Sequence, residues 1–190
     1  MTSIVLASLL CALPPARPRA PAPAAQPNTA PAEQLTDEQI RERIDGFMGT
    51  IDTRIMPEQW RALGPRGAAV LEQIAQDTTV LPTRRAKAVA GLSEIGASSS
   101  SAVLLGLAGS EQAPLTVRLA AVHGVPRVLP TAQVASALKP VLEGARDGHV
   151  RGAAAEILSA HGGCSMVRAQ AQREDDRLRM QRALERCGQQ

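Results

Sequence analysis

The sequence is almost free of aromatic residues: Tyr is absent, and Phe and Trp occur once each, as Phe47 and Trp60. A core so poor in rings must be filled by Ala, Leu, Val and Ile, with Trp60 as one large core anchor. Proteins that bind single-stranded nucleic acid stack bases on aromatic side chains, and such side chains are missing here. The formal net charge of +3 is also too small for a nucleic-acid footprint. We therefore expect no nucleic-acid partner.

Catalytic signatures are missing as well. The sequence contains no His-Glu-x-x-His, Gly-x-Ser-x-Gly or phosphate-loop pattern. The histidines His123, His149 and His161 are not followed by Glu and are spread over the chain, so we interpret each as a surface or cap residue. Residues 64–67, Gly-Pro-Arg-Gly, are interpreted as a turn between helices. The sequence therefore predicts no catalytic residue, no metal ligand and no cofactor, and a protein that is not an enzyme.

Long hydrophobic runs are absent too. Residues 4–13 form one run of ten mostly apolar residues, whereas a membrane-spanning helix takes about 20. Such a run is typical of a signal peptide, which we place at 1–25, followed by a Pro- and Ala-rich disordered tether at 26–34 and a folded domain at 35–190. This predicts export to the periplasm, the cell envelope or the medium. No Lys or Arg precedes the run, so a cytoplasmic location stays open.

What the chain does contain is an internal repeat. Arg85, Arg118 and Arg151 follow one another at intervals of 33 residues, and each is followed at +7 by Leu or Val. An apolar i, i+3, i+4 pattern precedes the arginine in each unit, as in Leu71, Ile74 and Ala75. Strict alternation of apolar and polar residues is missing from the same region. Each unit is therefore predicted to be two α-helices, the second beginning near the arginine.

These units resemble a known family. The string Asp-Gly-His-Val-Arg-Gly-Ala-Ala-Ala-Glu-Ile-Leu at 147–158 resembles the second helix of a HEAT repeat, written Asp-x-x-Val-Arg-x-x-Ala-Ala-x-x-Leu. Residues 117–121 are similar, and 85–92 form a weaker copy. The resemblance covers roughly residues 57–162. It implies an all-α fold, a right-handed α-solenoid of about three HEAT-like helix pairs with helical caps at the N- and C-terminal ends.

The resemblance also implies a role for the repeated arginines, because in that family they commonly pair with an Asp of a neighbouring unit. Only Asp147 occupies the matching acidic position here, and Glu111 or Asp77 could substitute elsewhere. The expected inter-repeat structural ladder consists of Arg85, Arg118, Arg151 and Asp147. The alternative is that the arginines form a basic stripe for an anionic ligand.

The predicted N-terminal cap begins at Leu35. Thr36 and Gln39 have the spacing of a capping box, and Leu35 and Ile40 can form the hydrophobic staple around it. Apolar residues then recur at helical spacing as far as Ile55. We therefore predict one helix over this segment, which Gly46 and Gly49 weaken and can kink. This helix covers the open end of the array.

Three cysteines are present, and removal of a signal peptide would take Cys11 and leave Cys164 and Cys187. One unbroken helix would hold the remaining two about 35 Å apart, whereas a disulfide allows about 4.4–6.8 Å between Cα atoms. We therefore predict a helical hairpin over 164–187, reversed near 174–176 and closed by a disulfide. The alternative is two unrelated thiols in an intracellular protein.

The HEAT resemblance favours a binding role, because arrays of this kind serve as scaffolds and adaptors and only a few are enzymes. We expect a non-enzymatic protein- or peptide-binding module in the bacterial cell envelope or the medium. Its alternatives are a HEAT-like lyase or cofactor-handling protein, and a purely structural spacer in an envelope assembly. From helix phase, the partner-binding candidates on the second helices are Arg84, Lys87, Glu94, His123, Arg127 and Glu156.

Overall fold

The computed structural model describes residues 35–50, 54–174 and 177–189. Within these ranges all regular structure is helical and no strand occurs, which confirms the all-α prediction for the described residues. The predicted signal peptide at 1–25 and tether at 26–34 lie outside the described residues. The helices are α1 Asp37–Gly49, α2 Pro57–Arg61, α3 Gly64–Gln76, α4 Pro82–Ile95, α5 Ser101–Gly109, α6 Leu115–Val128, α7 Thr131–Gly144, α8 Gly148–Ala160, α9 Cys164–Ala171 and α10 Arg177–Gly188.

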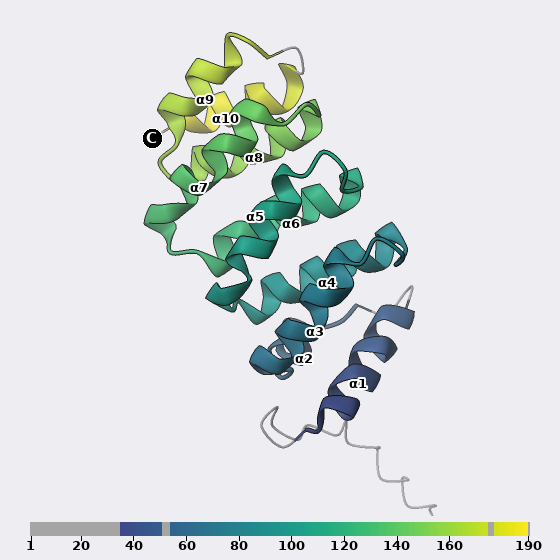
Figure 1. The fold of residues 1–190 in the computed structure, drawn as a ribbon. Coiled ribbons are helices and arrows are strands. Elements are labelled where there is room, and N and C mark those ends of the chain that lie inside the picture. Colours follow the sequence, from purple (N-terminus) through teal and green to yellow (C-terminus); the bar gives the residue numbers. More distant parts are fainter. Residues whose placement is uncertain (1–34, 51–53, 175–176, 190) are drawn as a thin grey trace, which may run out of the picture.

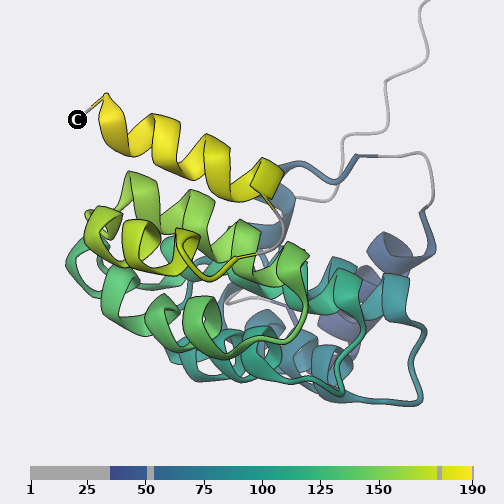
Figure 2. The ribbon, with the colours of Figure 1, turned by 90° about the horizontal axis from the view of Figure 1, so that it is seen from above.

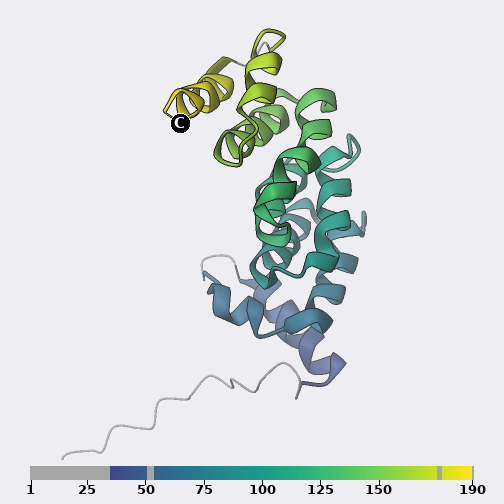
Figure 3. The same cartoon turned by 90° about the vertical axis from the view of Figure 1, so that its left-hand side faces the viewer.

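The helices from α3 onward are arranged as successive pairs. Helix α3 packs on α4, α5 on α6, α7 on α8, and α9 on α10. The second members also contact one another in order, α4 with α6, α6 with α8 and α8 with α10. Figures 1 and 3 show the pairs following one another from α1 at the purple end to α10 at the yellow end.

Proline and glycine set the ends of the paired helices. Pro82 opens α4, and Pro114 and Pro130 are the N-cap residues of α6 and α7. Proline suits these positions because its fixed φ fits the first turn and its missing N–H would have no partner there. Gly96 ends α4 in the left-handed region at φ 71°, a conformation that glycine adopts without strain.

The core is one continuous cluster of aliphatic side chains that runs between the pairs. Two glycines that lie 33 residues apart, Gly91 in α4 and Gly124 in α6, leave room for neighbouring side chains. A Cβ atom at Gly91 would meet the Trp60 ring at 2.8 Å, and one at Gly124 would meet the Ser93 hydroxyl at 2.1 Å. Gly91 therefore admits the Trp60 ring of α2, whereas Gly124 allows α6 to approach α4.

The capping box at the start of α1 is confirmed. The Thr36 hydroxyl accepts the Gln39 N–H at 3.2 Å, and the Gln39 side chain accepts the Thr36 N–H at 2.9 Å. Leu35 and Ile40, the predicted staple, are both buried. Together the capping box and the two buried residues define the N-terminus of α1.

The prediction of one helix as far as Ile55 is wrong, because α1 ends at Gly49 and Ile55 is not helical. Thr50 terminates the helix, with its hydroxyl donating to the Phe47 carbonyl at 2.8 Å. A side chain that bonds the last carbonyls offers the backbone an alternative to another turn. Residues 51–53 lie outside the described residues.

The short helix α2 follows and places Trp60 in the core, as predicted, with 4% of its surface exposed. The ring centroids of Trp60 and Phe47 are 5.0 Å apart in an edge-to-face arrangement, which joins α1 to α2. The interpretation of residues 64–67 as a turn is wrong. They form the first turn of α3, and only Gly64 has a turn-like φ of 61°.

The C-terminal segment is a pair of helices rather than one rod. Cys164 at the start of α9 and Cys187 near the end of α10 lie at disulfide-bonding distance, with their Cα atoms 5.6 Å apart. Of the predicted reversal at 174–176, residues 175 and 176 lie outside the described residues. Helix α10 also packs along α8 (Figure 2). Gly152 of α8 faces the Arg179 side chain there.

Candidate functional site

The repeated arginines occupy the same place in each pair. Each is the fourth residue of its second helix, Arg85 in α4, Arg118 in α6 and Arg151 in α8. Arg85 and Arg118 expose only 5% and 4% of their surface, and Arg151 is half-buried. A guanidinium so far from water needs hydrogen-bond acceptors, so the contacts of these side chains define what the site can do.

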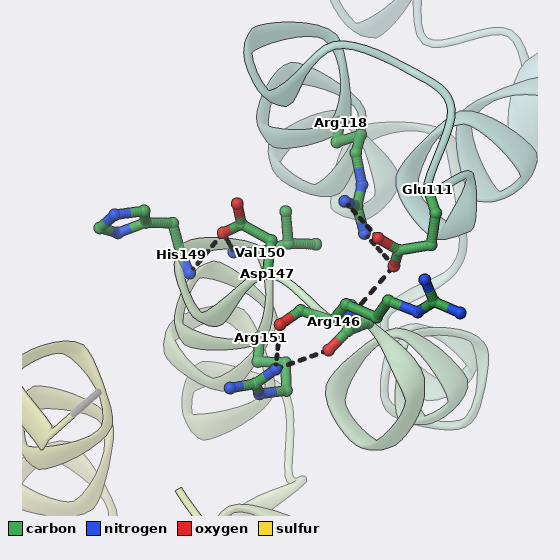
Figure 4. A network of polar contacts seen from close by, with 8 residues as sticks. Glu111, Arg118, Arg146, Asp147, His149, Val150 and Arg151 are labelled. Carbon is green, nitrogen blue, oxygen red and sulfur yellow. Dashed lines mark hydrogen bonds and ion pairs between the residues drawn. The ribbon is translucent and has the colours of Figure 1, made fainter. Parts of the chain in front are cut away.

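Arg118 is held by a carboxylate of the loop before its helix. Its Nη1 and Nη2 donate to Glu111 Oε2 and Oε1 at 3.0 and 2.7 Å. Glu111 Oε1 also accepts the backbone N–H of Arg146 at 2.9 Å, so one carboxylate joins the second pair to the third (Figure 4). The Arg146 N–H, and after it the Arg118 guanidinium, lower the pKa of Glu111.

The carboxylate partner of Arg151 follows it in the sequence, whereas the partner of Arg118 precedes it. Its Nε and Nη2 donate to Glu174, each at 2.5 Å, and Glu174 is buried. Its Nη1 donates to the carbonyls of Ala145 and Arg146 at 2.7 Å each (Figure 4). Arg151 therefore ties the α7–α8 loop to the segment after α9, a contact that the sequence analysis did not anticipate.

Asp147 has a different role from the expected one. Its carboxylate accepts the N–H groups of His149 at 2.8 Å and Val150 at 3.4 Å, and so caps the N-terminus of α8 (Figure 4). An Asp at the N-cap satisfies helix donors that have no other partner. The acidic member of the arginine ladder is thus Glu111 for Arg118 and Glu174 for Arg151.

Arg85 is the exception among the repeated arginines. Its Nε donates to the Ala75 carbonyl at the end of α3, at 2.9 Å. In the described part of the chain, no carboxylate lies within ion-pair distance of its guanidinium. Arg85 also lines a cavity of about 450 Å³ between the first two pairs.

The predicted partner-binding residues fall into separate groups. Glu94 at the end of α4 and Arg127 near the end of α6 form an ion pair at 2.7 Å across the two helices. Arg61 of α2, which the sequence analysis missed, lies 3.9 Å from the same carboxylate. We call these three residues the charged cluster; among them, Arg61 and Arg127 are exposed.

The other candidates lie elsewhere. Lys87 donates to the Thr50 carbonyl and hydroxyl at 2.7 and 2.9 Å, and Arg84 lies 3.6 Å from Asp45, so both tie α4 to the N-terminal cap. His123 is exposed on α6 and Glu156 is half-buried on α8. Of the six candidates, the structure thus brings Glu94 and Arg127 together and places Arg84 and Lys87 against the N-terminal cap.

Among residues 35–50, 54–174 and 177–189, no group of three or more His, Cys, Asp or Glu side chains is arranged to hold a metal ion. No helix in the same ranges is both long and apolar enough to cross a bilayer.

No protein-family model, no curated protein and no solved structure matches this chain. We therefore infer its function from the geometry of its own residues.

Proposed function

We propose that the chain is a protein-binding module, built as a right-handed HEAT-like α-solenoid of three helix pairs with a helical cap at each end. Two observations support this architecture. The arginines spaced by 33 residues all stand at the fourth position of a second helix, and each pair packs on the next in chain order. Stacked repeats of this kind present long surfaces suited to binding other polypeptides.

The charged cluster is the observation that carries the binding proposal. Glu94 lies between two exposed arginines that come from different helices, Arg61 and Arg127. The two arginines expose 55% and 54% of their side chains, whereas Glu94 exposes 21%, so both guanidinium groups stay accessible to a partner. A partner that presents its own acidic groups can compete for the arginines and gain specificity and association rate from the match of charges. The proposed binding surface is therefore the outer face of α2, α4 and α6 around Glu94.

We further propose that the module is exported and held on the Pro- and Ala-rich tether at 26–34. Support comes from the cysteine pair at disulfide-bonding distance in α9 and α10, since structural disulfides persist mainly in oxidising compartments. The apolar run at 4–13 has the length of a signal-peptide core.

Affinity capture with matched variants tests the binding proposal. The bait is the purified chain, applied to the envelope fraction of the source cells, alongside Arg127→Glu and the double variant Glu94→Arg with Arg127→Glu. Lys139→Glu is the control, because it breaks an exposed ion pair with Glu143 on α7, on another helix row. Circular dichroism verifies that all variants remain folded.

We expect the unmodified chain and Lys139→Glu to retain the same partner, and Arg127→Glu to retain at least tenfold less of it. The double variant restores attraction between the two side chains but exchanges the positions of their charges. It should therefore also retain little of the partner. Equal retention by all four proteins would reject the charged cluster as the binding surface. A pigment or metal that co-purifies with the chain in stoichiometric amount would instead support a cofactor-handling protein.

A further inference from the structure

The cavity beside Arg85 lies where the first helix pair meets the second. Its wall combines the loop after α3 with one side of α5 and the loop after it, and includes Thr78, Val103, Leu107 and Ser110. Its volume of about 450 Å³ falls within the range of small-ligand sites. The wall combines the aliphatic side chains of Val103 and Leu107 with the hydroxyl groups of Thr78 and Ser110, and the Arg85 side chain, which is 5% exposed, also lines it.

Arg85 and Arg118 use different nitrogen atoms of the guanidinium group for their hydrogen bonds. Arg118 uses both Nη atoms on the Glu111 carboxylate, and its buried Nε has no hydrogen-bond partner among the described residues. Arg85 uses its Nε on the Ala75 carbonyl. Within the described ranges no side chain supplies a carboxylate to its Nη atoms, the fork that binds carboxylates in two-point fashion.

A single sequence position explains why Arg85 lacks the acidic partner that Arg118 has. The loops 77–81 and 110–114 have the same length and the same turn, with the Val80 N–H bonded to the Asp77 carbonyl and the Ala113 N–H bonded to the Ser110 carbonyl, both at 3.2 Å. Glu111 stands seven residues before Arg118, and the residue seven before Arg85 is Thr78. The first unit thus has Thr78 in the place that holds the carboxylate in the second unit.

Asp77 is the described acid that acts on Arg85 at longer range, and its own bonds keep it in the turn. Its Oδ1 accepts both the N–H and the hydroxyl of Thr79, at 2.8 and 2.6 Å. These bonds, more than the charge of Arg85, lower the pKa of the Asp77 carboxyl. Asp77 therefore serves its own loop as a turn-forming residue.

We infer that the cavity beside Arg85 is a binding site for a carboxylate ligand, which takes the position that the Glu111 carboxylate holds in the next unit. The ligand's carboxylate is bound by the Nη atoms of Arg85, and its aliphatic part lies against Val103 and Leu107. A small apolar group with one carboxylate fits this wall, either as the C-terminal residue of a polypeptide or as a free short-chain acid.

This site is separate from the charged cluster. Arg85 lies nine residues before Glu94 on α4, which corresponds to about 14 Å along the helix. The carboxylate site and the proposed protein-binding surface can therefore be tested, and can fail, independently.

The test is a titration of the full chain with butyrate, followed by the NMR signal of the Arg85 Nε–H group and the backbone signals of Val103 and Leu107. Butyramide, which has the same shape without the charge, is the matched control ligand. An acetylated dipeptide that ends in valine is titrated with a free C-terminal carboxylate and again as the amide. These two arms separate a chain terminus from a free acid as the source of the carboxylate.

Three variants locate the site. Arg85→Gln removes the charge, and Thr78→Glu supplies a tethered carboxylate at the position of Glu111. Thr131→Glu makes the same substitution at the start of α7, away from the cavity wall. Because Arg85→Gln can also destabilise the fold, Thr78→Glu is the decisive variant, and its thermal midpoint is measured as well.

We expect saturable shifts with butyrate that butyramide does not reproduce, and at least a tenfold loss of affinity in Thr78→Glu and Arg85→Gln. Thr131→Glu should bind butyrate as the unmodified chain does. Thr78→Glu should have a higher thermal midpoint than both the unmodified chain and Thr131→Glu. Binding of the dipeptide acid at least tenfold tighter than butyrate assigns the site to chain termini, and equal affinity assigns it to free acids. Equal binding of butyrate and butyramide, no saturable shift with any acid, or unchanged affinity in Thr78→Glu would overturn the proposal.

Discussion

Replacement of Gly124 by Ala should separate the second helices of the first two repeats. Gly124 lies in the middle of α6, where its Cα faces α4. An added Cβ would lie 2.1 Å from the Ser93 hydroxyl and 3.3 Å from Leu104 Cδ1. The hydroxyl cannot move aside freely, because it is buried and donates to the Val89 carbonyl at 2.9 Å. The helices must therefore move apart to admit one methyl group.

The size of the effect follows from two opposing contributions. An added methylene in a closely packed core costs about 1–3 kcal/mol, whereas Ala in place of Gly inside a helix gains about 0.5–1 kcal/mol. We expect Gly124→Ala to lower the free energy of unfolding by about 0.5–2 kcal/mol. Gly106→Ala is the matched control, because Gly106 lies inside α5 with nothing within 4 Å of its added Cβ. That variant should be more stable than the unmodified chain by up to about 1 kcal/mol.

Urea unfolding followed by circular dichroism at 222 nm measures both variants. A double-mutant cycle with Ser93→Ala sharpens the comparison, because the loss of the hydroxyl relieves the nearest contact of the new methyl group. We expect a coupling of about 1 kcal/mol in favour of the double variant. Equal stability of Gly124→Ala and Gly106→Ala, or a coupling near zero, would refute the close approach of α4 and α6.

Three further predictions concern Glu111, Asp147 and the pair of cysteines. Glu111→Gln should destabilise the chain at neutral pH, because the folded pKa of Glu111 is lowered. The ionised Glu111 carboxylate stabilises the fold fully above the ordinary glutamate pKa of about 4.3. This contribution disappears as the pH falls through the pKa of the folded state. Urea unfolding at a series of pH values checks this, and a difference between the two proteins that is independent of pH would contradict it. Asp147→Ala should cost about 1 kcal/mol through the lost cap of α8, whereas Asp147→Asn, which retains a capping oxygen, should cost much less; thermal unfolding distinguishes the two. Cys187→Ser should lower the free energy of unfolding by about 3 kcal/mol relative to the oxidised chain. Addition of reductant should lower the stability of the unmodified protein by the same amount and leave the variant unchanged, which would verify that Cys164 and Cys187 form the bond.

Much of the helical arrangement could be read from the sequence, because it depends on local signals. The spacing of Arg85, Arg118 and Arg151 located each second helix, and proline and glycine marked the ends. The end of α1 could not be read in this way. Apolar residues continue at helical spacing to Ile55, but Thr50 bonds the Phe47 carbonyl and terminates the helix at Gly49. Periodicity is insensitive to a single side chain that competes for a carbonyl.

The partners of the arginines were harder to predict because they depend on distant parts of the chain. Glu174 lies 23 residues after Arg151, in a segment whose position depends on how α9 packs. Asp147 fits both the family pattern and an N-cap, and only the geometry distinguishes the two roles. Glu111 was among the acids that the sequence suggested, and its spacing could have assigned it: Glu111 precedes Arg118 by seven residues, and the same count from Arg85 reaches Thr78, which is not an acid.

Arg118 and Arg151 differ in where along the chain their acidic partners lie. The second unit contains both Arg118 and Glu111, so a gene duplication that copied it would produce a module already balanced in charge. The third unit contains Arg151 but borrows Glu174 from beyond it, so a stop codon after α8 would leave a half-buried cation without its acid. A copy of the second unit would therefore carry the acid for its own arginine, whereas a copy of the third unit would need an acid from outside it.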